Sequence, residues 1–302
     1  MKVLVLGSSA GGGFPQWNCN CRNCRGVREG TLRAKPRTQS SIAVSADTES
    51  WVLFNASPDI LAQLKANPIL QPARKLRDTG IAAIILVDSQ IDHTTGLFML
   101  REGAPLQVYC TASVREDLTG GNPIFNVLSS YCGVNWHPMR TGESFSIPGV
   151  ERLSFVAVPV ASKAPPFSPH RDNPRPGDNI GLLVRDSATG GTLFYAPGLA
   201  EIDEKIASAI GQAECVMIDG TCWTDDEMIR TGAGHKRALE MGHLAQSGEN
   251  GMLAQLRRFP GPRKILIHIN NTNPILDEDS AERAELEREG IEVAYDGMEV
   301  VL

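Results

Sequence analysis

Short apolar runs rich in β-branched residues recur along the chain and predict β-strands. Residues 84–87 form a continuous apolar run, as expected of a strand that is covered on both faces. Residues 40–46 and 51–55 predict a hairpin-like pair, and the first of these runs alternates apolar and polar positions. Further strands are predicted at 2–6, 106–110, 151–160, 180–185, 192–195, 215–218, 264–269, 292–294 and 299–302.

Stretches of helical character alternate with these strands. One helix is expected to begin with Ser57 as its N-cap and Pro58 at its first helical position. Others are predicted at 112–118, 124–131, 200–210, 245–259 and 278–289, and the run 97–100 indicates a helix start. The alternation predicts an α/β fold, a four-layer αββα sandwich in which two sheets lie between outer helices. No boundary or repeat divides the chain, so residues 1–302 are expected to form a single domain.

Composition narrows the class of protein. The chain has 302 residues, of which 42% are hydrophobic, and this is ample for a sizeable core. A formal charge of -6 and a pI near 5.6 argue against a nucleic-acid binder, which would usually carry a basic patch. The first apolar run is too short for a signal peptide, and no later run reaches membrane-spanning length. We therefore expect a cytoplasmic protein without a membrane segment.

Side chains that bind metals or protons follow several predicted strands. Asp92 and His93 come shortly after the strand at 84–87, His268 lies near the end of the strand at 264–269, and Asp219 follows the strand at 215–218. Adjacent carboxylate and imidazole side chains at the end of a buried strand can bind a metal ion, so the chemistry of the chain is expected at the end of the strand at 84–87. Alternative roles remain open: a core histidine for His268 and a helix N-cap for Asp92. Asp219 is either a fourth ligand or an acceptor that orients His93 or His268.

Three cysteines, Cys19, Cys21 and Cys24, lie within six positions of one another. All three thiols can face one centre only if the backbone wraps around it, which predicts a structural zinc site separate from the active site. The alternative is three unrelated buried cysteines. The chain has seven cysteines, an odd number that favours metal binding over disulfides, and no fourth ligand lies nearby in the sequence.

Two loops are candidates for contact with a substrate. Residues 161–176 are too rich in proline for a helix and too numerous for a simple connection, which favours a lid or substrate-binding loop. Lys163, His170 and Arg171 on this loop could hold substrate carboxylates, although solvated loop charges are equally common. The glycine-rich segment 7–13 is expected to form a tight loop beside the active site.

Several motifs together resemble a known family. The segments 11–24, 57–59, 88–96, 163–166 and 295–299 resemble the B family of pyrroloquinoline quinone (PQQ) biosynthesis proteins, within the metallo-β-lactamase superfamily. The superfamily motif is His-x-His-x-Asp-His. Here Asp92 and His93 match its second half, whereas Asp88 and Gln90 replace its two leading histidines. The resemblance therefore implies one metal ion, bound by Asp92, His93 and His268.

The same resemblance suggests roles for two further residues. His243 aligns with a proton-donating histidine of related hydrolases, and capping a helix is its alternative role. Asn271 occupies the position at which related phosphodiesterases place a histidine as the fourth zinc ligand.

The family resemblance implies an enzyme of PQQ cofactor biosynthesis. The implied reaction is iron-dependent hydroxylation of the tyrosine ring in a glutamate-tyrosine precursor, with Fe(II) at the active site, where other divalent metals can substitute. The expected partners are this peptide or amino-acid-derived precursor and dioxygen, with a second copy of the chain as a candidate partner in a homodimer. Two alternatives stay open: a hydrolase that uses a metal-bound water on a phosphodiester or peptide, and a carrier that moves PQQ or its precursor towards the periplasm.

Overall fold

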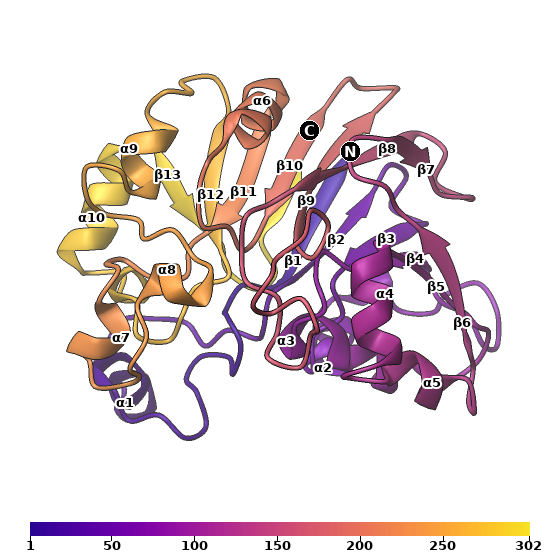
Figure 1. Ribbon diagram of the computed structural model, residues 1–302, viewed down its shortest axis with the longest axis horizontal. Coiled ribbons are helices and arrows are strands. Elements are labelled where there is room, and N and C mark those ends of the chain that lie inside the picture. Colours follow the sequence, from indigo (N-terminus) through magenta and orange to yellow (C-terminus); the bar gives the residue numbers. More distant parts are fainter.

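Two seven-stranded sheets form the centre of the molecule in the computed structural model, which describes residues 1–302 (Figure 1). The first sheet has the order β14-β1-β2-β3-β4-β5-β6. Its strands are β1 (Lys2–Gly7), β2 (Ser41–Ser45), β3 (Trp51–Phe54), β4 (Ile81–Ile85), β5 (Leu106–Cys110), β6 (Val134–Pro138) and β14 (Glu299–Val301).

The second sheet has the order β13-β12-β11-β10-β9-β8-β7. Its strands are β7 (Ser144–Ser146), β8 (Leu153–Pro159), β9 (Ile180–Asp186), β10 (Thr192–Ala196), β11 (Cys215–Asp219), β12 (Arg263–Ile267) and β13 (Ile291–Val293). Both sheets are mixed: neighbouring strands are parallel from β3 to β6 in the first sheet and from β10 to β13 in the second, and antiparallel elsewhere. Parallel strands end at the same edge of a sheet, so the loops that follow β4, β11 and β12 can meet.

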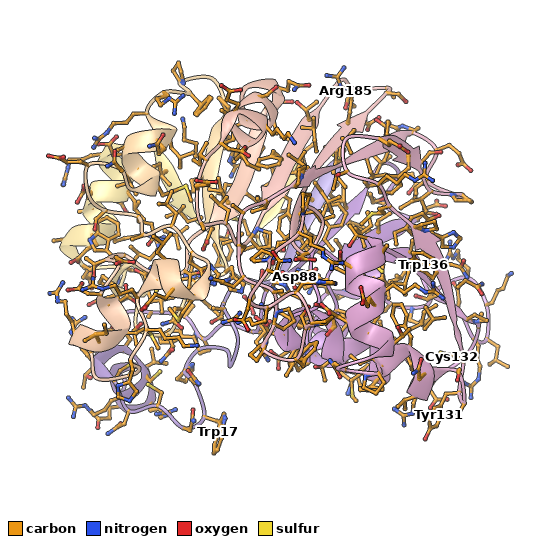
Figure 2. All side chains as sticks on the ribbon, in the orientation of Figure 1. Trp17, Asp88, Tyr131, Cys132, Trp136 and Arg185 are labelled. Carbon is orange, nitrogen blue, oxygen red and sulfur yellow. The ribbon has the colours of Figure 1, made fainter.

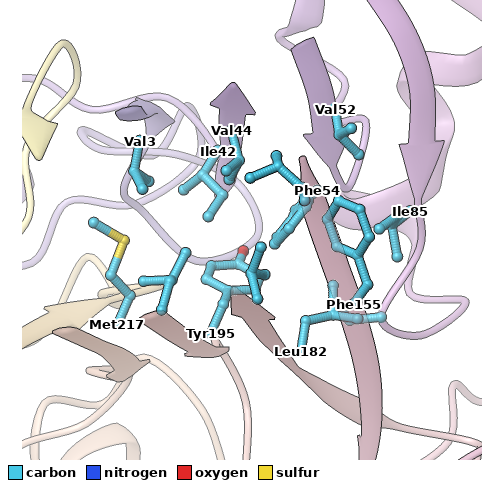
Figure 3. Close-up of a cluster of buried hydrophobic side chains, with 14 of the residues drawn as sticks. Val3, Ile42, Val44, Val52, Phe54, Ile85, Phe155, Leu182, Tyr195 and Met217 are labelled. Carbon is cyan, nitrogen blue, oxygen red and sulfur yellow. The ribbon is translucent and has the colours of Figure 1, made fainter. Parts of the chain in front are cut away.

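The largest hydrophobic cluster, of 29 buried residues, fills the space between the inner faces of the two sheets (Figure 3). Phe54 of the first sheet packs edge-on against Phe155 and Tyr195 of the second, with ring centroids 6.3 and 5.6 Å away. Along β3, Phe54 faces this cluster while Leu53 faces the outer helices. A strand that is buried on both faces needs apolar residues at every position, which explains the continuous apolar runs of the sequence.

Helices cover the outer faces of both sheets. Buried residues of α2, α4 and α5 form an 18-residue cluster with the outer face of the first sheet, and those of α6, α9 and α10 join a 24-residue cluster on the second. The helices are α1 (Arg22–Glu29), α2 (Ile60–Ala66), α3 (Ile91–Thr94), α4 (Ala112–Thr119), α5 (Ile124–Leu128), α6 (Glu204–Gln212), α7 (Glu227–Arg230), α8 (Ala238–Met241), α9 (Met252–Leu256) and α10 (Ala281–Arg288), with 3₁₀ turns at Pro68–Leu70, Thr95–Leu100 and Pro274–Leu276. The predicted four-layer αββα sandwich is thus confirmed. None of the helices combines the length and apolar character needed to span a membrane.

Several predicted helix boundaries are wrong. The helix predicted at 245–259 is confined to Met252–Leu256, because Gly248 has φ = 99° and the N-cap is Gly251. The helix predicted from 200 begins at Glu204, where the side chain of Asp203 accepts a hydrogen bond from the backbone N–H of Ile206. Local capping therefore decided these boundaries, and the apolar pattern did not.

The helix expected to begin at Ser57 instead begins at Ile60, with Asp59 at the N-cap. The hydroxyl of Ser57 accepts from the backbone N–H of Asp59, which makes a turn before the helix. The carboxylate of Asp59 is bound by the backbone and side-chain amides of Gln39. It is therefore used to fix the neighbouring loop and does not cap the helix.

The sequence analysis missed two strands and four helices, one of which is the short α3, which precedes the helix start predicted at 97–100. The strands β6 and β7 are short and only partly buried, so neither shows a clear apolar run. The helices α1, α7 and α8 have few buried residues, and their sequences therefore lack a recognisable apolar face.

Asp296, just before β14, fastens the closing segment to the first loop. Its carboxylate accepts hydrogen bonds from the backbone N–H and hydroxyl groups of both Ser8 and Thr38, at distances of 2.6–3.0 Å. Ser8 in turn accepts the backbone N–H of Ile269, the residue after His268. Asp296 thus helps to place the glycine-rich loop beside the segment that carries His268.

Replacing Asp296 with Ala should lower the free energy of unfolding by about 3 kcal/mol, because the backbone N–H groups of buried Ser8 and half-buried Thr38 lose their acceptor. Urea denaturation followed by circular dichroism measures this change. Glu299→Ala is the matched control, since Glu299 is exposed and forms only a surface ion pair with Lys2. Equal stability of the two variants would contradict the role given to Asp296.

Candidate active site

The candidate ligands meet where β4 and β12 end, near the middle of the molecule, where Asp88 is labelled in Figure 2. His93 lies on α3, eight residues after β4 ends at Ile85, and His268 directly follows β12. One ligand atom from each of Asp92, His93 and His268 lies within 4.8 Å of the others. The fold therefore brings together three residues that are separated by up to 176 positions in the sequence.

A buried carboxylate fixes the orientation of the His93 ring. Its Nδ1 lies 2.8 and 2.9 Å from the two oxygens of Asp88. Burial alone would lower the pKa of His93, but the charges of Asp88 and Asp92 raise it to about 9. With Nδ1 bound to Asp88, Nε2 points into the site and is buried without any hydrogen-bond partner. An unpartnered nitrogen in this position is suited to bind a metal ion.

The His268 ring is held in a similar way by Thr221. The hydroxyl of Thr221 donates to Asp219 Oδ1 at 2.6 Å and lies 2.9 Å from His268 Nδ1, so this nitrogen donates to the hydroxyl. The backbone of His268 has φ = 61°, a conformation that non-glycine residues seldom adopt and that often occurs at functional sites. Its Nε2 faces Asp92 Oδ2 at 3.3 Å.

Asp92 completes the set with a carboxylate that faces both rings. Its Oδ2 lies 3.8 Å from His93 Nε2 and 3.3 Å from His268 Nε2. Donor atoms about 2.1 Å from a common ion would be separated by about 3 to 3.5 Å, so only a small movement is needed to bind one. Asp92 is not the helix N-cap, because that position belongs to Gln90. Burial would raise the pKa of Asp92, but the two imidazoles hold it well below its usual range.

Asp219 pairs with His243 and makes no contact with His93. Asp219 Oδ2 lies 2.7 Å from His243 Nδ1, and the carboxylate is fully buried. Burial opposes both charges, yet their attraction lowers the pKa of Asp219 and raises that of His243. Asp219, His243 and His268 also lie within 4.8 Å of one another. The dyad can therefore move a proton at His243, and through Thr221 Asp219 also orients His268.

A cavity of about 330 Å³ opens above these residues. Gly11 of the glycine-rich loop lines it, and a Cβ atom at that position would lie 3.2 Å from Asp92 Oδ2. The predicted place of this loop beside the site thus follows from a close approach that a larger residue would crowd. Other walls come from Gln90, Asn270 and Lys236.

Only part of the proline-rich loop reaches the cavity. Arg171, Ser162 and Pro166 line it, whereas Lys163 and His170 do not. His170 is buried, and its Nε2 lies 3.0 Å from a carboxylate oxygen of Glu116 on α4. Of the three basic residues expected to contact a substrate, only Arg171 therefore lies at the cavity, since His170 pairs with α4 and Lys163 contacts Gln90 through its backbone carbonyl.

The three clustered cysteines converge in the structure. Their Sγ atoms all lie within 4.8 Å of one another, at the start of α1, where Cys21 is the N-cap. Asn271 places its amide nitrogen 3.0 Å from Cys19 Sγ and 3.3 Å from Cys24 Sγ. Burial raises the pKa of Cys21 to about 12. A tetrahedral zinc ion with Zn–S bonds of about 2.3 Å needs sulfur atoms about 3.8 Å apart, which this arrangement allows.

Sequence reasoning missed the contacts of Asp88 and Thr221 with the two histidines. Asp88 was identified only as a replacement for a missing histidine, although a carboxylate five residues before a candidate ligand histidine is a recognisable orienting partner. Thr221 carries no local signal, because its contact with His268 comes from the packing of segments that are distant in the chain.

Comparison with known proteins places the chain in a family. The model of the beta-lactamase superfamily domain matches residues 50–269. Coenzyme PQQ synthesis protein B from Ectopseudomonas mendocina (strain ymp) is 62% identical over 304 residues, with both chains covered completely. The crystal structure of Zn²⁺-bound PqqB from Methylobacterium extorquens superposes with a TM-score of 0.92 at 40% identity, again over the full length of both chains.

A more distant solved structure, a diphosphatase from the PhnP family, shares the fold. It has a TM-score of 0.68 and 19% identity, and the match covers 100% of this chain and 97% of the diphosphatase. At this level of identity the likeness concerns the architecture only. The full-length identity to the curated relatives is what shows the family: the chain belongs to the coenzyme PQQ synthesis protein B family of the beta-lactamase superfamily, and it serves the biosynthesis of the PQQ cofactor.

Proposed function

We propose that this protein is a metal-dependent hydroxylase that adds oxygen to the tyrosine ring of a glutamate-tyrosine precursor of PQQ, in the cytoplasm. The observation that carries the proposal is the convergence of two imidazole Nε2 atoms and one carboxylate, from His93, His268 and Asp92, on a single point. Two histidines and one carboxylate with open positions are the ligand set of non-haem Fe(II) oxygenases. Fe(II) bound there would supply the activation of dioxygen, the second substrate. One oxygen atom would enter the ring and the other would leave as water, with two electrons taken from a co-reductant such as ascorbate.

A single metal ion follows from the role of Asp88. In a two-metal hydrolase of this superfamily, position 88 would carry a histidine of the other metal site. Here the Asp88 carboxylate is occupied by His93 Nδ1 and by the backbone N–H of Gln90. The use of the Asp88 carboxylate as the acceptor for His93, in place of a histidine ligand, supports a single metal ion and favours the oxygenase over the hydrolase.

The protein's own residues supply the remaining steps. Asp219 holds His243 Nδ1, so that the other ring nitrogen, Nε2, can accept or return the proton of the phenol. Gly11, Pro166 and the other cavity walls limit access of water, and Arg171 binds a carboxylate of the substrate. The second class of function that the site could perform is hydrolysis, for which the His243 dyad would protonate the leaving group.

We also propose that Cys19, Cys21 and Cys24 bind a structural zinc ion. Asn271 lies over the three thiols and could provide the fourth ligand through its amide oxygen after rotation of the side chain, since amide oxygen and nitrogen differ little in shape. A zinc ion here would fasten α1 to the segment that follows His268.

The role of Asp88 predicts the effect of one conservative change. Asp88→Asn should weaken the affinity of the active site for Mn²⁺ by about ten- to a hundred-fold, because an amide cannot offer His93 Nδ1 the same charged acceptor. Titration followed by electron paramagnetic resonance measures the affinity. Glu116→Gln is the control, because Glu116 pairs with His170 outside the cavity. Unchanged affinity in Asp88→Asn would refute the orienting role.

The cysteine cluster predicts a separate zinc ion. Cys21→Ser should release about one zinc per chain and lower the melting temperature, since a structural zinc ion contributes directly to folding. Elemental analysis and calorimetry are the measurements. Cys132→Ser should change neither, because Cys132 lies on the far side of the first sheet, before β6. Wild-type zinc content in Cys21→Ser would rule the site out.

The proposed reaction is tested with protein reconstituted anaerobically with Fe(II). On addition of dioxygen, with ascorbate as the two-electron reductant, it should convert glutamyl-tyrosine to a product heavier by one or more oxygen atoms, measured by mass spectrometry. His93→Ala should abolish the conversion, because it removes a metal ligand. Lack of oxygen incorporation by the iron form, together with phosphodiester cleavage by the zinc form, would replace the hydroxylase with the hydrolase.

A further inference from the structure

Two cationic side chains on different loops line the active-site cavity without an ion-pair partner. Arg171 belongs to the loop after β8, and Lys236 to the loop between α7 and α8. Arg171 donates to the backbone carbonyl of Ala164, and no carboxylate lies within ion-pair distance of either residue. In an acidic chain with many surface ion pairs, two unpaired cations on one cavity call for an explanation.

The carboxylates of the same cavity do not neutralise these cations. Asp88 faces His93, and Asp92 faces His93 and His268. The charge that remains for a ligand is therefore positive, on a molecule whose net charge is -6. A concave site of this sign attracts and orients an anion.

The two cations differ in depth and in support. Arg171 is half-buried, and its loop is bonded through Lys163 to Gln90, the N-cap of the helix that carries Asp92 and His93. Lys236 is exposed at the rim. Its loop is nevertheless anchored, because the backbone N–H groups of Ala233 and Gly234 both donate to the carbonyl of Met228, which also lines the cavity.

We propose that Arg171 and Lys236 form a clamp for two carboxylates, which makes the enzyme specific for a substrate that carries two carboxylate groups. The inference rests on the proposed function, which places the tyrosine ring on the cavity floor beside Asp92. The α-carboxylate of that tyrosine then lies closer to the cavity floor and binds the planar guanidinium group of Arg171. The carboxylate of the glutamate side chain extends to Lys236 at the rim.

The clamp is tested by calorimetric titration of the zinc-loaded protein, which binds substrate without oxidising it. Three dipeptides serve as probes. Glutamyl-tyrosine has both carboxylates. Its C-terminal amide lacks the α-carboxylate that is expected to bind Arg171, and glutaminyl-tyrosine lacks the side-chain carboxylate that is expected to bind Lys236. In the unaltered protein each neutral replacement should weaken binding by about ten- to a hundred-fold, as for loss of a charge-assisted hydrogen bond.

Two variants separate the cations. In Lys236→Gln the penalty for glutaminyl-tyrosine should disappear while that for the amide remains, and Arg171→Gln should show the reverse. Lys236→Arg should restore the full pattern. Arg237→Gln and Arg175→Gln are the matched controls, because each alters a neighbouring cation on the same loop that does not line the cavity. Metal analysis and circular dichroism confirm that each variant is loaded and folded.

Equal binding of the three dipeptides, binding of none of them, or penalties that persist in both variants would overturn the clamp. Its failure is distinguishable from that of the proposed reaction, which is measured separately as oxygen incorporation. Charge-specific binding without hydroxylation would retain the clamp and reject the hydroxylase. Hydroxylation without charge-specific binding would do the opposite.

Discussion

Face-to-face packing of the two sheets is the constraint on which the rest of the structure depends. Because 29 buried residues fill the space between the sheets, the ends of β4, β11 and β12 are held at one edge of the sandwich. Val87, just before Asp88, shows how tightly this edge is fixed. Its N–H donates to the side chain of Asn55 in the first sheet, and its carbonyl accepts from Ile180 in the second. The segment with the candidate ligands Asp92 and His93 therefore begins from a backbone position that both sheets hold in place.

Buried acceptors then determine which atoms of the two histidines face the cavity. A neutral imidazole has one N–H and one lone pair, so an acceptor on Nδ1 directs the lone pair of Nε2 to the opposite side. Asp88 does this for His93, and Thr221 with Asp219 does it for His268. Position 88, which the superfamily motif gives to a histidine, here carries a carboxylate that orients the His93 ring.

One short segment connects the candidate active site with the cysteine cluster. His268 faces the cavity, Ile269 pairs with the first loop through Ser8 and Ala10, and Asn271 contacts the three thiols. Asn271, which contacts the cysteines, lies only three residues after the proposed metal ligand His268. A metal ion at the cysteines would stiffen this segment and help to hold His268 in its unusual backbone conformation.

The sequence alone determined the architecture and the residue types of the site. Strands covered on both faces need continuous apolar runs, so the strands that end at or shortly before Asp92, Asp219 and His268 were recognisable without a structure. The cysteine spacing was equally informative, because three thiols in six positions can surround a common point only in a few backbone conformations. Edge strands such as β6 and helix starts such as that of α9 were missed or misplaced, since exposure and capping leave no periodic apolar signal.

Only the tertiary structure decided which side chains act together. His170 and Arg171 are neighbours in sequence, yet one pairs with Glu116 on α4 and the other lines the cavity. Asp219 could have oriented either ligand histidine, and the fold places it on His243 and, through Thr221, on His268. These pairings depend on distances between loops far apart in the chain. Such distances are set by the packing of the two sheets and not by any pattern within a single segment.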